Sequence, residues 1–217
     1  MTKVFYLDVS ALSDASLYED ALKLLSPQRI KKLNTIKNIN DKQLSAGAWL
    51  CLTKALKSFP ELSGSIEIVI DKNGKPYFKN CDFLHFSLSH SGSVALCALS
   101  DKKVGADVQL IGDFNDKICK KYFSSSEAQY VFSASSQEEM AQRFFRLWSL
   151  KEAYVKMTGE GLFGFKKLCV MQNFLNHPRD VSFAEYDIDG YKIAVCTKDE
   201  ETDFEIKKLN LSQILIN

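Results

Sequence analysis

The chain has 217 residues, of which 46% are hydrophobic, 12% aromatic and 25% charged. This composition is typical of an ordinary globular protein and disfavours a disordered, collagen-like or coiled-coil chain. The 28 basic and 27 acidic residues leave a formal charge of +1, so the overall field gives no reason to expect binding to nucleic acid or to a membrane, and any anion site must be local.

The cysteines and the N-terminal segment bear on the compartment. Six cysteines lie far apart, with no C-x-x-C pair and no zinc-ligand spacing, so we expect reduced thiols. The opening letters MTKVFYLDVS lack the apolar core of a signal peptide, and no run approaches the ~20 apolar residues of a membrane span. We therefore expect a cytoplasmic protein with no membrane partner.

Helical signals dominate the first sixty residues. After a short strand in the letters VFYLD, Ser16 and Glu19 form a capping-box pattern that predicts a helix. Ser26 before Pro27 predicts a second helix start, with the serine as N-cap. Apolar residues at helical spacing then predict a longer helix over about 40–59.

The apolar pattern next changes from a period of 3.6 to a period of 2. Strands are predicted, in chain order, in the letters SIEIVI, PYF, FLHFSLSH, SVALCALS and VGADVQLI. Asn73 before Gly74 predicts a tight turn between the first two strands, and residues 101–103 predict another short connection. These strands make up the first predicted sheet.

Helical periodicity returns after Gly112. Ser124 and Glu127 form a second capping box, and a long helix is predicted over about 138–157, with glycines beyond its end. The letters KKLCVM, VSFAEYD and YKIAVCT then predict strands. The acidic run over 199–205 predicts a solvated turn.

The order of helices, sheet, helices and sheet predicts an α+β protein. We expect two similar fused halves, 1–102 and 103–217, which are tightly joined because no Pro/Gly/Ser linker separates them. Each half is expected to pack helices on a small, mainly antiparallel sheet, with the active site in the cleft between the halves. Fusion of the two halves also favours a monomer.

An acidic residue interrupts the last strand of this sheet. Along VGADVQLI, Asp107 and Gln109 share one face, opposite Ala106 and Val108. A buried aspartate is costly unless it is hydrogen-bonded, paired or bound to a metal. The pattern leaves open a structural ion pair or a ligand for a hard metal ion.

The long predicted helix carries a second candidate cluster. Trp148, Glu152 and Lys156 lie four residues apart and share one stripe. Glu152 and Lys156 also have the spacing of an ordinary surface ion pair, which contributes only ~0.3 to 0.5 kcal/mol. The indole of Trp148 indicates that this face is partly covered, and a partly buried Glu152 would need a cation.

Candidate phosphate contacts form the third group. Ser89 and His90 are neighbours on a predicted strand, so they project to opposite faces and are not expected to form a nucleophilic pair. His90 is either a satisfied core histidine or a hydrogen-bond donor to a phosphate. The basic residues that follow residue 28, together with Lys75, are either a solvated face or a shelf for a multiply phosphorylated small molecule. They are Arg29, Lys31, Lys32, Lys37 and Lys42.

Five motifs occur in one order: GKPY, FSLSHSG, GADVQ, FS-x-x-E and W-x-x-KEAYVK-x-x-GEGL. Together they resemble the 4'-phosphopantetheinyl transferases, specifically the larger two-halved type that activates surfactin synthetase. The resemblance spans about residues 26–165. It implies transfer of the phosphopantetheine arm of coenzyme A to a serine of an apo acyl or peptidyl carrier protein, with magnesium as cofactor and with release of 3',5'-ADP.

The same resemblance implies roles for individual residues. The residues that match the family's magnesium-binding acids are Asp107 and Glu152. The residues that match its phosphate contacts are Ser89, His90 and Lys156. Further coenzyme A contacts are matched by Lys75 and, at the 3'-phosphate, by Arg29 and Lys32. The residues expected to be catalytic are Asp107, His90, Glu152 and Lys156.

Three positions depart from the family pattern. Gln109 stands where many relatives have a third acid, so it is expected at the metal as an amide. Two carboxylates suffice for magnesium, which keeps several waters when it binds phosphates. Gln43 and Leu44 replace an arginine and a small hydroxyl residue, so weaker contacts to the adenosine end are expected.

Phosphoryl transfer needs mainly positioning and charge neutralisation. Lys156 and His90 are expected to stabilise charge on the leaving group, and Glu152 is expected to take the proton of the attacking serine. Two alternatives remain open: a non-catalytic module that binds coenzyme A or a nucleotide, and a magnesium-dependent phosphohydrolase.

A docking surface for the carrier protein is expected in the polar segment 124–139, with Tyr130, Val131 and Phe132 as apolar anchors. The alternative is an ordinary amphipathic helix.

Overall fold

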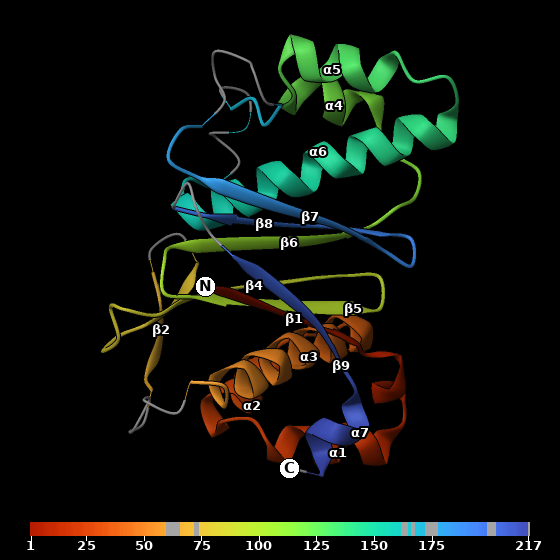
Figure 1. Cartoon of the computed structure of the whole chain (residues 1–217). Helices are drawn as coiled ribbons and strands as arrows, with labels where there is room; N and C mark the ends of the chain where they lie inside the picture. The colour runs from red at the N-terminus through yellow and green to blue at the C-terminus, as the bar shows by residue number, and fades with distance from the viewer. Residues whose placement is uncertain are drawn as a thin grey trace.

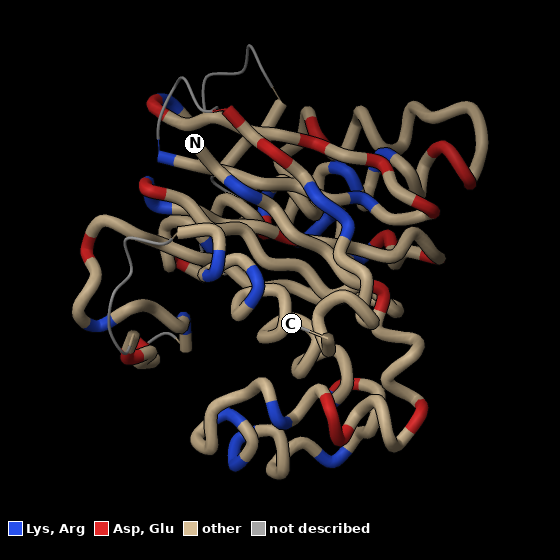
Figure 2. Tube along the Cα trace, turned by 60° about the horizontal axis from the view of Figure 1, so that its bottom comes forward, with Lys and Arg blue, Asp and Glu red and all other residues tan. Residues whose placement is uncertain are grey.

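The structure is a computed structural model that describes residues 1–59, 66–71, 74–161, 165, 168–171, 178–198 and 203–216. Figure 1 shows four layers: two stacked sheets lie between an upper and a lower layer of helices. Figure 2 shows basic and acidic residues interspersed along the whole trace, as the near-zero formal charge leads one to expect.

The lower sheet has the strand order β4-β5-β1-β9. Its strands are β1 (Thr2–Asp8), β4 (His85–Ser91), β5 (Val94–Ser100) and β9 (Phe204–Leu209). The β1–β5 and β4–β5 pairs are antiparallel, whereas β9 runs parallel to β1. The helices of the lower layer, which cover this sheet, are η1 (Ser10–Ser13), α1 (Ala15–Lys23), α2 (Pro27–Leu33), α3 (Ile39–Leu56) and α7 (Leu211–Leu215). Apolar side chains of these elements and of the sheet form one core.

The upper sheet has the strand order β6-β8-β7, and both of its pairs are antiparallel. Its strands are β6 (Val104–Leu110), β7 (Ser182–Ile188) and β8 (Tyr191–Thr197), and its helices are α4 (Asp116–Tyr122), α5 (Ser125–Phe132) and α6 (Gln137–Thr158). A small separate hairpin pairs β2 (Ile68–Ile70) with β3 (Pro76–Phe78). The structure therefore confirms the predicted α+β class and the mainly antiparallel pairing. The prediction of one sheet from the five strands before residue 112 is wrong: β2 and β3 form a separate hairpin, β4 and β5 join the lower sheet, and β6 joins the upper sheet.

The two large sheets contact each other through apolar side chains of β1 and β5 on one side and of β6 and β8 on the other. Beside this core, the hydroxyl oxygens of Ser87, Ser89 and Ser91 accept hydrogen bonds from the backbone N–H groups of β6. The donors are Ala106, Val108 and Leu110, at 3.0, 3.3 and 3.0 Å. The hydroxyl groups of alternate serines of β4 thus accept hydrogen bonds from three backbone N–H groups at the edge of β6. These bonds bring the FSLSHSG and GADVQ motifs side by side.

Gly105 allows α6 to lie directly on β6. A Cβ atom at this position would lie 1.9 Å from the carbonyl oxygen of Ala153 and 2.4 Å from the amide nitrogen of Met157. Only glycine permits such a close approach of a helix backbone to a strand. The contact places the KEAYVK segment of α6 over the strand that carries Asp107.

Most local signals in the sequence are confirmed. Ser26 caps α2 with Pro27 in the first turn, and Ser124 with Glu127 forms the capping box of α5. Gly159 ends α6 in the left-handed conformation, with a φ of 79°. The predicted cap of the first helix is wrong: Asp14, rather than Ser16, accepts the hydrogen bonds that start α1.

Two predictions on the C-terminal part are corrected. The letters KKLCVM do not form the predicted strand, because residues 168–171 lie in no strand and residues 166 and 167 are outside the described residues. The end of the acidic run is not a turn, since Phe204 and Glu205 begin β9; residues 199–202 lie outside the described part. Asn73 of the predicted tight turn is likewise not described.

The division at residue 103 stays a prediction. The segments before and after it each contribute helices and a sheet, but β9 and α7, which come last in the chain, pack with the lower sheet and its core. Over the described residues, every helix is too short or too polar to cross a membrane. All six cysteines are buried and free of disulfide bonds.

Candidate functional site

A cavity of about 360 Å³ lies where α3, β4, β6 and α6 meet. The polar residues that line it come from distant parts of the chain: Ser45, Ser89, His90, Asp107, Gln109, Glu152 and Lys156. Trp49 and Leu88 contribute apolar surface to the same cavity. The structure therefore brings together the predicted metal ligands and three of the predicted phosphate contacts.

Asp107 is 1% exposed and has partners on both carboxylate oxygens. Its Oδ1 accepts hydrogen bonds from the Ser89 hydroxyl at 2.7 Å and from Lys156 Nζ at 2.6 Å. Its Oδ2 accepts a hydrogen bond from Gln109 Nε2 at 2.8 Å. These partners offset the cost of burying the carboxylate. The Asp107 carboxylate thereby connects the FSLSHSG, GADVQ and KEAYVK motifs.

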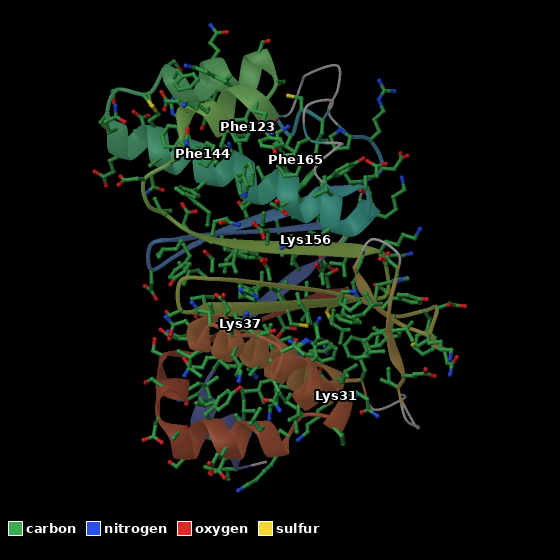
Figure 3. All side chains as sticks on the ribbon, turned by 180° about the vertical axis from the view of Figure 1, so that it is seen from behind. Lys31, Lys37, Phe123, Phe144, Lys156 and Phe165 are labelled. Atoms are coloured by element: carbon green, nitrogen blue, oxygen red, sulfur yellow. The ribbon has the colours of Figure 1, made fainter. Side chains whose placement is uncertain are left out.

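Lys156 connects α6 to both strands at the cavity. Besides Asp107, its Nζ donates a hydrogen bond to the Ser89 hydroxyl at 2.9 Å. The surface ion pair with Glu152 that the spacing allowed is therefore not the arrangement adopted by Lys156. Figure 3 shows Lys156 between α6 and the strands below it, whereas Phe123, Phe144 and Phe165 gather in the outer helical layer.

Glu152 is half-buried and lines the cavity without a hydrogen bond or salt bridge to any residue in the described part of the chain. Burial raises its pKa, the nearby charge of Asp107 raises the pKa further, and Lys156 partly opposes both effects. Two carboxylates so close to one another favour either a proton or a cation between them.

The cavity offers oxygen atoms of the kind that a divalent cation prefers, although the described residues contain no group of three or more Asp, Glu, His or Cys side chains that could hold a metal. Asp107 and Glu152 supply carboxylates, and Gln109 supplies an amide whose nitrogen donates to Asp107. Mg²⁺ prefers oxygen ligands and uses one or two protein carboxylates together with substrate phosphates. Two carboxylates are therefore compatible with such an ion, and Asp107, Glu152 and Gln109 are the residues that would hold it.

His90 lies on the opposite side of β4 from Ser89 but lines the same cavity. Although His90 is exposed overall, the protein atoms around its ring partly exclude water and lower its pKa; the positive charges of Lys156 and Arg29 lower the pKa further, while Asp41 opposes them. The imidazole is therefore neutral near pH 7, with one N–H group available as a donor.

The two basic residues predicted for the 3'-phosphate differ in their placement. The Nη2 of Arg29 donates hydrogen bonds to the backbone carbonyl of Ser45, at 3.4 Å, and to the Ser45 hydroxyl. The guanidinium also lies over the indole of Trp49, 4.6 Å from the ring centroid. Lys32 is exposed and is not among the residues that line this cavity.

Lys75 lies at a second, open cavity of about 310 Å³, which shares Leu88, Glu152 and Lys156 with the first. Its Nζ donates a hydrogen bond to the carbonyl of Met157 at 3.1 Å. That carbonyl belongs to the last turn of α6, where helix carbonyls lack intrahelical partners. Lys75 thus joins the β2–β3 hairpin to α6 beside the site.

Lys151 and Trp148 belong to the same helix as Glu152 but contact the core of the upper helices and not the cavity. Lys151 is fully buried, forms a 2.9 Å salt bridge with the fully buried Glu127, and donates a 2.7 Å hydrogen bond to the Phe165 carbonyl. Trp148 packs against Phe144 and Phe165, with centroid distances of 5.8 and 5.1 Å. Both residues fix α6 rather than line the cavity.

Ser45 and Trp49 are site residues that sequence reasoning did not identify. They lie one helical turn apart on α3, and a serine one turn before a tryptophan within the apolar stretch 44–52 is the signal that could have indicated them. Gln43, expected near the adenosine end, instead donates a hydrogen bond to the carbonyl of Leu12 at 2.8 Å.

The proposed docking segment needs one correction. Val131 is fully buried in the core of the upper helices, so it cannot serve as a surface anchor. Tyr130 and Phe132 are partly buried, and basic groups lie over both rings: Arg143 over Tyr130 at 4.6 Å and Lys120 over Phe132 at 5.7 Å.

Comparison with known proteins points to one family. Residues 103–207 match the family model described as the 4'-phosphopantetheinyl transferase superfamily. The chain is 33% identical over 136 residues to the 4'-phosphopantetheinyl transferase psf-1 of Bacillus pumilus, and the alignment covers 58% of each protein. The chain thus spans a little over half of that relative.

Two further relatives align over nearly their whole length. The 4'-phosphopantetheinyl transferase AcpT of Salmonella typhimurium is 30% identical over 200 residues, which are 91% of this chain and 92% of AcpT. The 4'-phosphopantetheinyl transferase Sfp of Bacillus subtilis (strain 168) is 25% identical over 208 residues, which are 91% of this chain and 92% of Sfp.

Proposed function

The chain belongs to the 4'-phosphopantetheinyl transferase superfamily, and on that basis we propose that it transfers the 4'-phosphopantetheine arm of coenzyme A to a serine of an apo acyl or peptidyl carrier protein. The observation that carries this proposal is the convergence of Asp107, Glu152 and Lys156 on one cavity. The product that leaves is 3',5'-ADP.

The reaction breaks the phosphoanhydride bond of the coenzyme A pyrophosphate and forms a phosphoester bond to the carrier serine. The carrier serine oxygen attacks the phosphorus atom that bears the pantetheine arm, and the bond from that phosphorus to the oxygen of 3',5'-ADP breaks. The electron pair stays with the departing nucleotide, whose new negative charge is stabilised by Lys156 and by the N–H group of His90. Because the nucleophile comes from the carrier, the chain itself needs none.

Glu152 is the proposed acceptor of the serine proton. Its carboxylate has no other partner among the described residues, and its raised pKa makes it a stronger base than an ordinary glutamate. Asp107 is held by Ser89, Gln109 and Lys156 and is therefore less free to accept a proton.

We also propose that Asp107, Glu152 and Gln109 hold Mg²⁺. When bound, this ion neutralises charge on the pyrophosphate of coenzyme A. Arg29, which contacts the lining residues Ser45 and Trp49, and Lys75, which lines the second cavity, are proposed to contact coenzyme A, and so is Lys32, from the exposed side of α2. A monomeric, cytoplasmic protein that binds neither nucleic acid nor membrane remains part of the proposal.

Incubation of the chain with coenzyme A, magnesium and an apo carrier protein tests the proposal by mass spectrometry. A carrier that gains the mass of one phosphopantetheine group supports it. Release of free phosphopantetheine without a carrier would indicate the phosphohydrolase, and binding of coenzyme A without any reaction would indicate the non-catalytic module. Glu152→Gln, which is nearly isosteric, is the matched inactive control.

A further inference from the structure

Arg29 is a half-buried cation without a counter-ion. No acidic side chain in the described part of the chain forms a salt bridge with its guanidinium, and its Nε atom is buried without a hydrogen-bond partner. Burial lowers the pKa of Arg29 to about 10, which shows that its surroundings disfavour the charge. A buried cation of this kind is stabilised when an anion binds beside it.

The guanidinium is nevertheless fixed in place. Its plane lies over the Trp49 indole, and Nη2 donates to both the backbone carbonyl and the hydroxyl of Ser45. Trp49 and Ser45 both line the polar cavity. A guanidinium that already lies on a ring and already has one edge hydrogen-bonded loses little entropy when it binds a ligand.

Arg29 lies behind two residues, Ser45 and Trp49, that line the cavity together with His90. The positive charge of Arg29 is one of the causes that lower the pKa of His90, so the two groups lie within electrostatic reach of each other. The neighbouring candidates are held less firmly at this end: Gln43 donates to the Leu12 carbonyl, and Lys32 is exposed, whereas Arg29 is half-buried against two lining residues. Arg29 is therefore the fixed cation at the α3 side of the cavity.

We propose that Trp49, together with Ser45, is a positioning residue that holds Arg29 for the 3'-phosphate of coenzyme A, so that the Arg29–Trp49 pair sets the preference of this chain for coenzyme A over dephospho-coenzyme A. The identity of the ligand rests on the proposed function.

The first measurement is binding of 3',5'-ADP and of 5'-AMP by calorimetry, which needs no carrier protein. The ratio of the two affinities isolates the contribution of the 3'-phosphate. We expect Arg29→Ala to lower this ratio about 30-fold, as for loss of a hydrogen bond to a charged group. Trp49→Ala should lower it about tenfold, and Trp49→Phe, which keeps a ring under the guanidinium, about twofold.

A double-mutant cycle separates positioning from mere packing. If Trp49 acts through Arg29, Trp49→Ala in the Arg29→Ala background has no further effect on the ratio. Phe59→Ala is the matched control, because it also removes a partly buried ring beside a cation, here Lys3 at 5.0 Å. That control should leave the ratio unchanged.

The second measurement is transfer to a carrier with coenzyme A and with dephospho-coenzyme A. Trp49→Ala should raise KM for coenzyme A about tenfold, with kcat and the KM for dephospho-coenzyme A nearly unchanged. If Trp49→Ala does not fold, Ser45→Ala and Trp49→Phe provide the same test. Each should lower the ratio of the affinities for 3',5'-ADP and 5'-AMP about two- to threefold.

An unchanged affinity ratio in Trp49→Ala, or additive effects in the double mutant, would overturn the inference while wild-type transfer still supports the proposed function. Wild-type protein that binds 3',5'-ADP more tightly than 5'-AMP but modifies no carrier would overturn the proposed function instead, and the nucleotide ratios would still decide the role of Trp49.

Discussion

The ammonium group of Lys156 lies 2.6 Å from Oδ1 of Asp107, although the two residues are 49 positions apart in the chain. Asp107 is nearly inaccessible to solvent, and Lys156 is only partly exposed. This contact holds α6 against β6 and orients the two groups that the proposed reaction needs at the phosphates.

Replacement of Lys156 by alanine should therefore affect stability as well as activity. It leaves the buried Asp107 without its cation, and we expect the free energy of unfolding to fall by ~2 to 4 kcal/mol. Urea unfolding measures this change. Lys23→Ala is a matched control, since Lys23 pairs with Asp20 at the same 2.6 Å but at the surface, where loss of the pair should leave the free energy of unfolding nearly unchanged. Equal effects of the two substitutions would contradict the assigned burial.

Glu152→Gln should abolish transfer to the carrier and leave the protein folded. The amide cannot accept the serine proton, and it removes a carboxylate that lies beside Asp107, so the thermal midpoint should stay the same or rise. Mass spectrometry of the carrier and a thermal melt check both parts. Glu205→Gln, on the exposed edge strand β9, serves as the control and should retain activity. A wild-type rate in Glu152→Gln would rule out the assigned role.

Gln109→Glu should lower the magnesium concentration needed for half-maximal activity. A third carboxylate next to Asp107 adds attraction for a divalent ion, and in its absence the extra charge should lower stability. Titration of activity with magnesium, and thermal melts with and without the metal, give the two readings. Identical titrations of both proteins would show that residue 109 does not contact the ion.

His85 should make stability depend on pH. Burial lowers its pKa, and Lys75 and Lys103 lower it further, while Asp82 and Asp101 oppose them. The unfolded chain therefore binds a proton at higher pH than the folded protein does, and the folded state loses stability as pH falls below about 6.5. His85→Asn should make the thermal midpoint less dependent on pH between about 5 and 7. A thermal midpoint that depends more steeply on pH in His85→Asn than in the wild type would contradict a lowered pKa of His85 in the folded protein.

Local signals in the sequence predicted the local structure well. Ser26 with Pro27, and Ser124 with Glu127, specify their helix starts through contacts within three residues, and both are confirmed. The cap of α1 was misplaced because Asp14 and Ser16 are both good capping residues, and the carboxylate of Asp14 accepts the backbone bonds as well as the Ser16 hydroxyl proton.

Contacts between segments that are distant in the chain could not be predicted from local sequence patterns. The parallel pairing of β9 with β1 joins the two ends of the chain, and no local pattern encodes it. The stacking of Arg29 on Trp49 depends on how α2 packs against α3. The convergence of Asp107 and Glu152 was predicted because five motifs resembled one family, and the physical basis became visible only with Gly105, which lets the helix backbone meet the strand.

The row of serines along β4 also protects the edge of the upper sheet. An edge strand presents unpaired backbone N–H groups that can pair with a strand of another molecule. Here the hydroxyl oxygens of Ser87, Ser89 and Ser91 occupy the N–H groups of Ala106, Val108 and Leu110. These three amides of β6 are therefore not available for edge-to-edge association between copies of the chain.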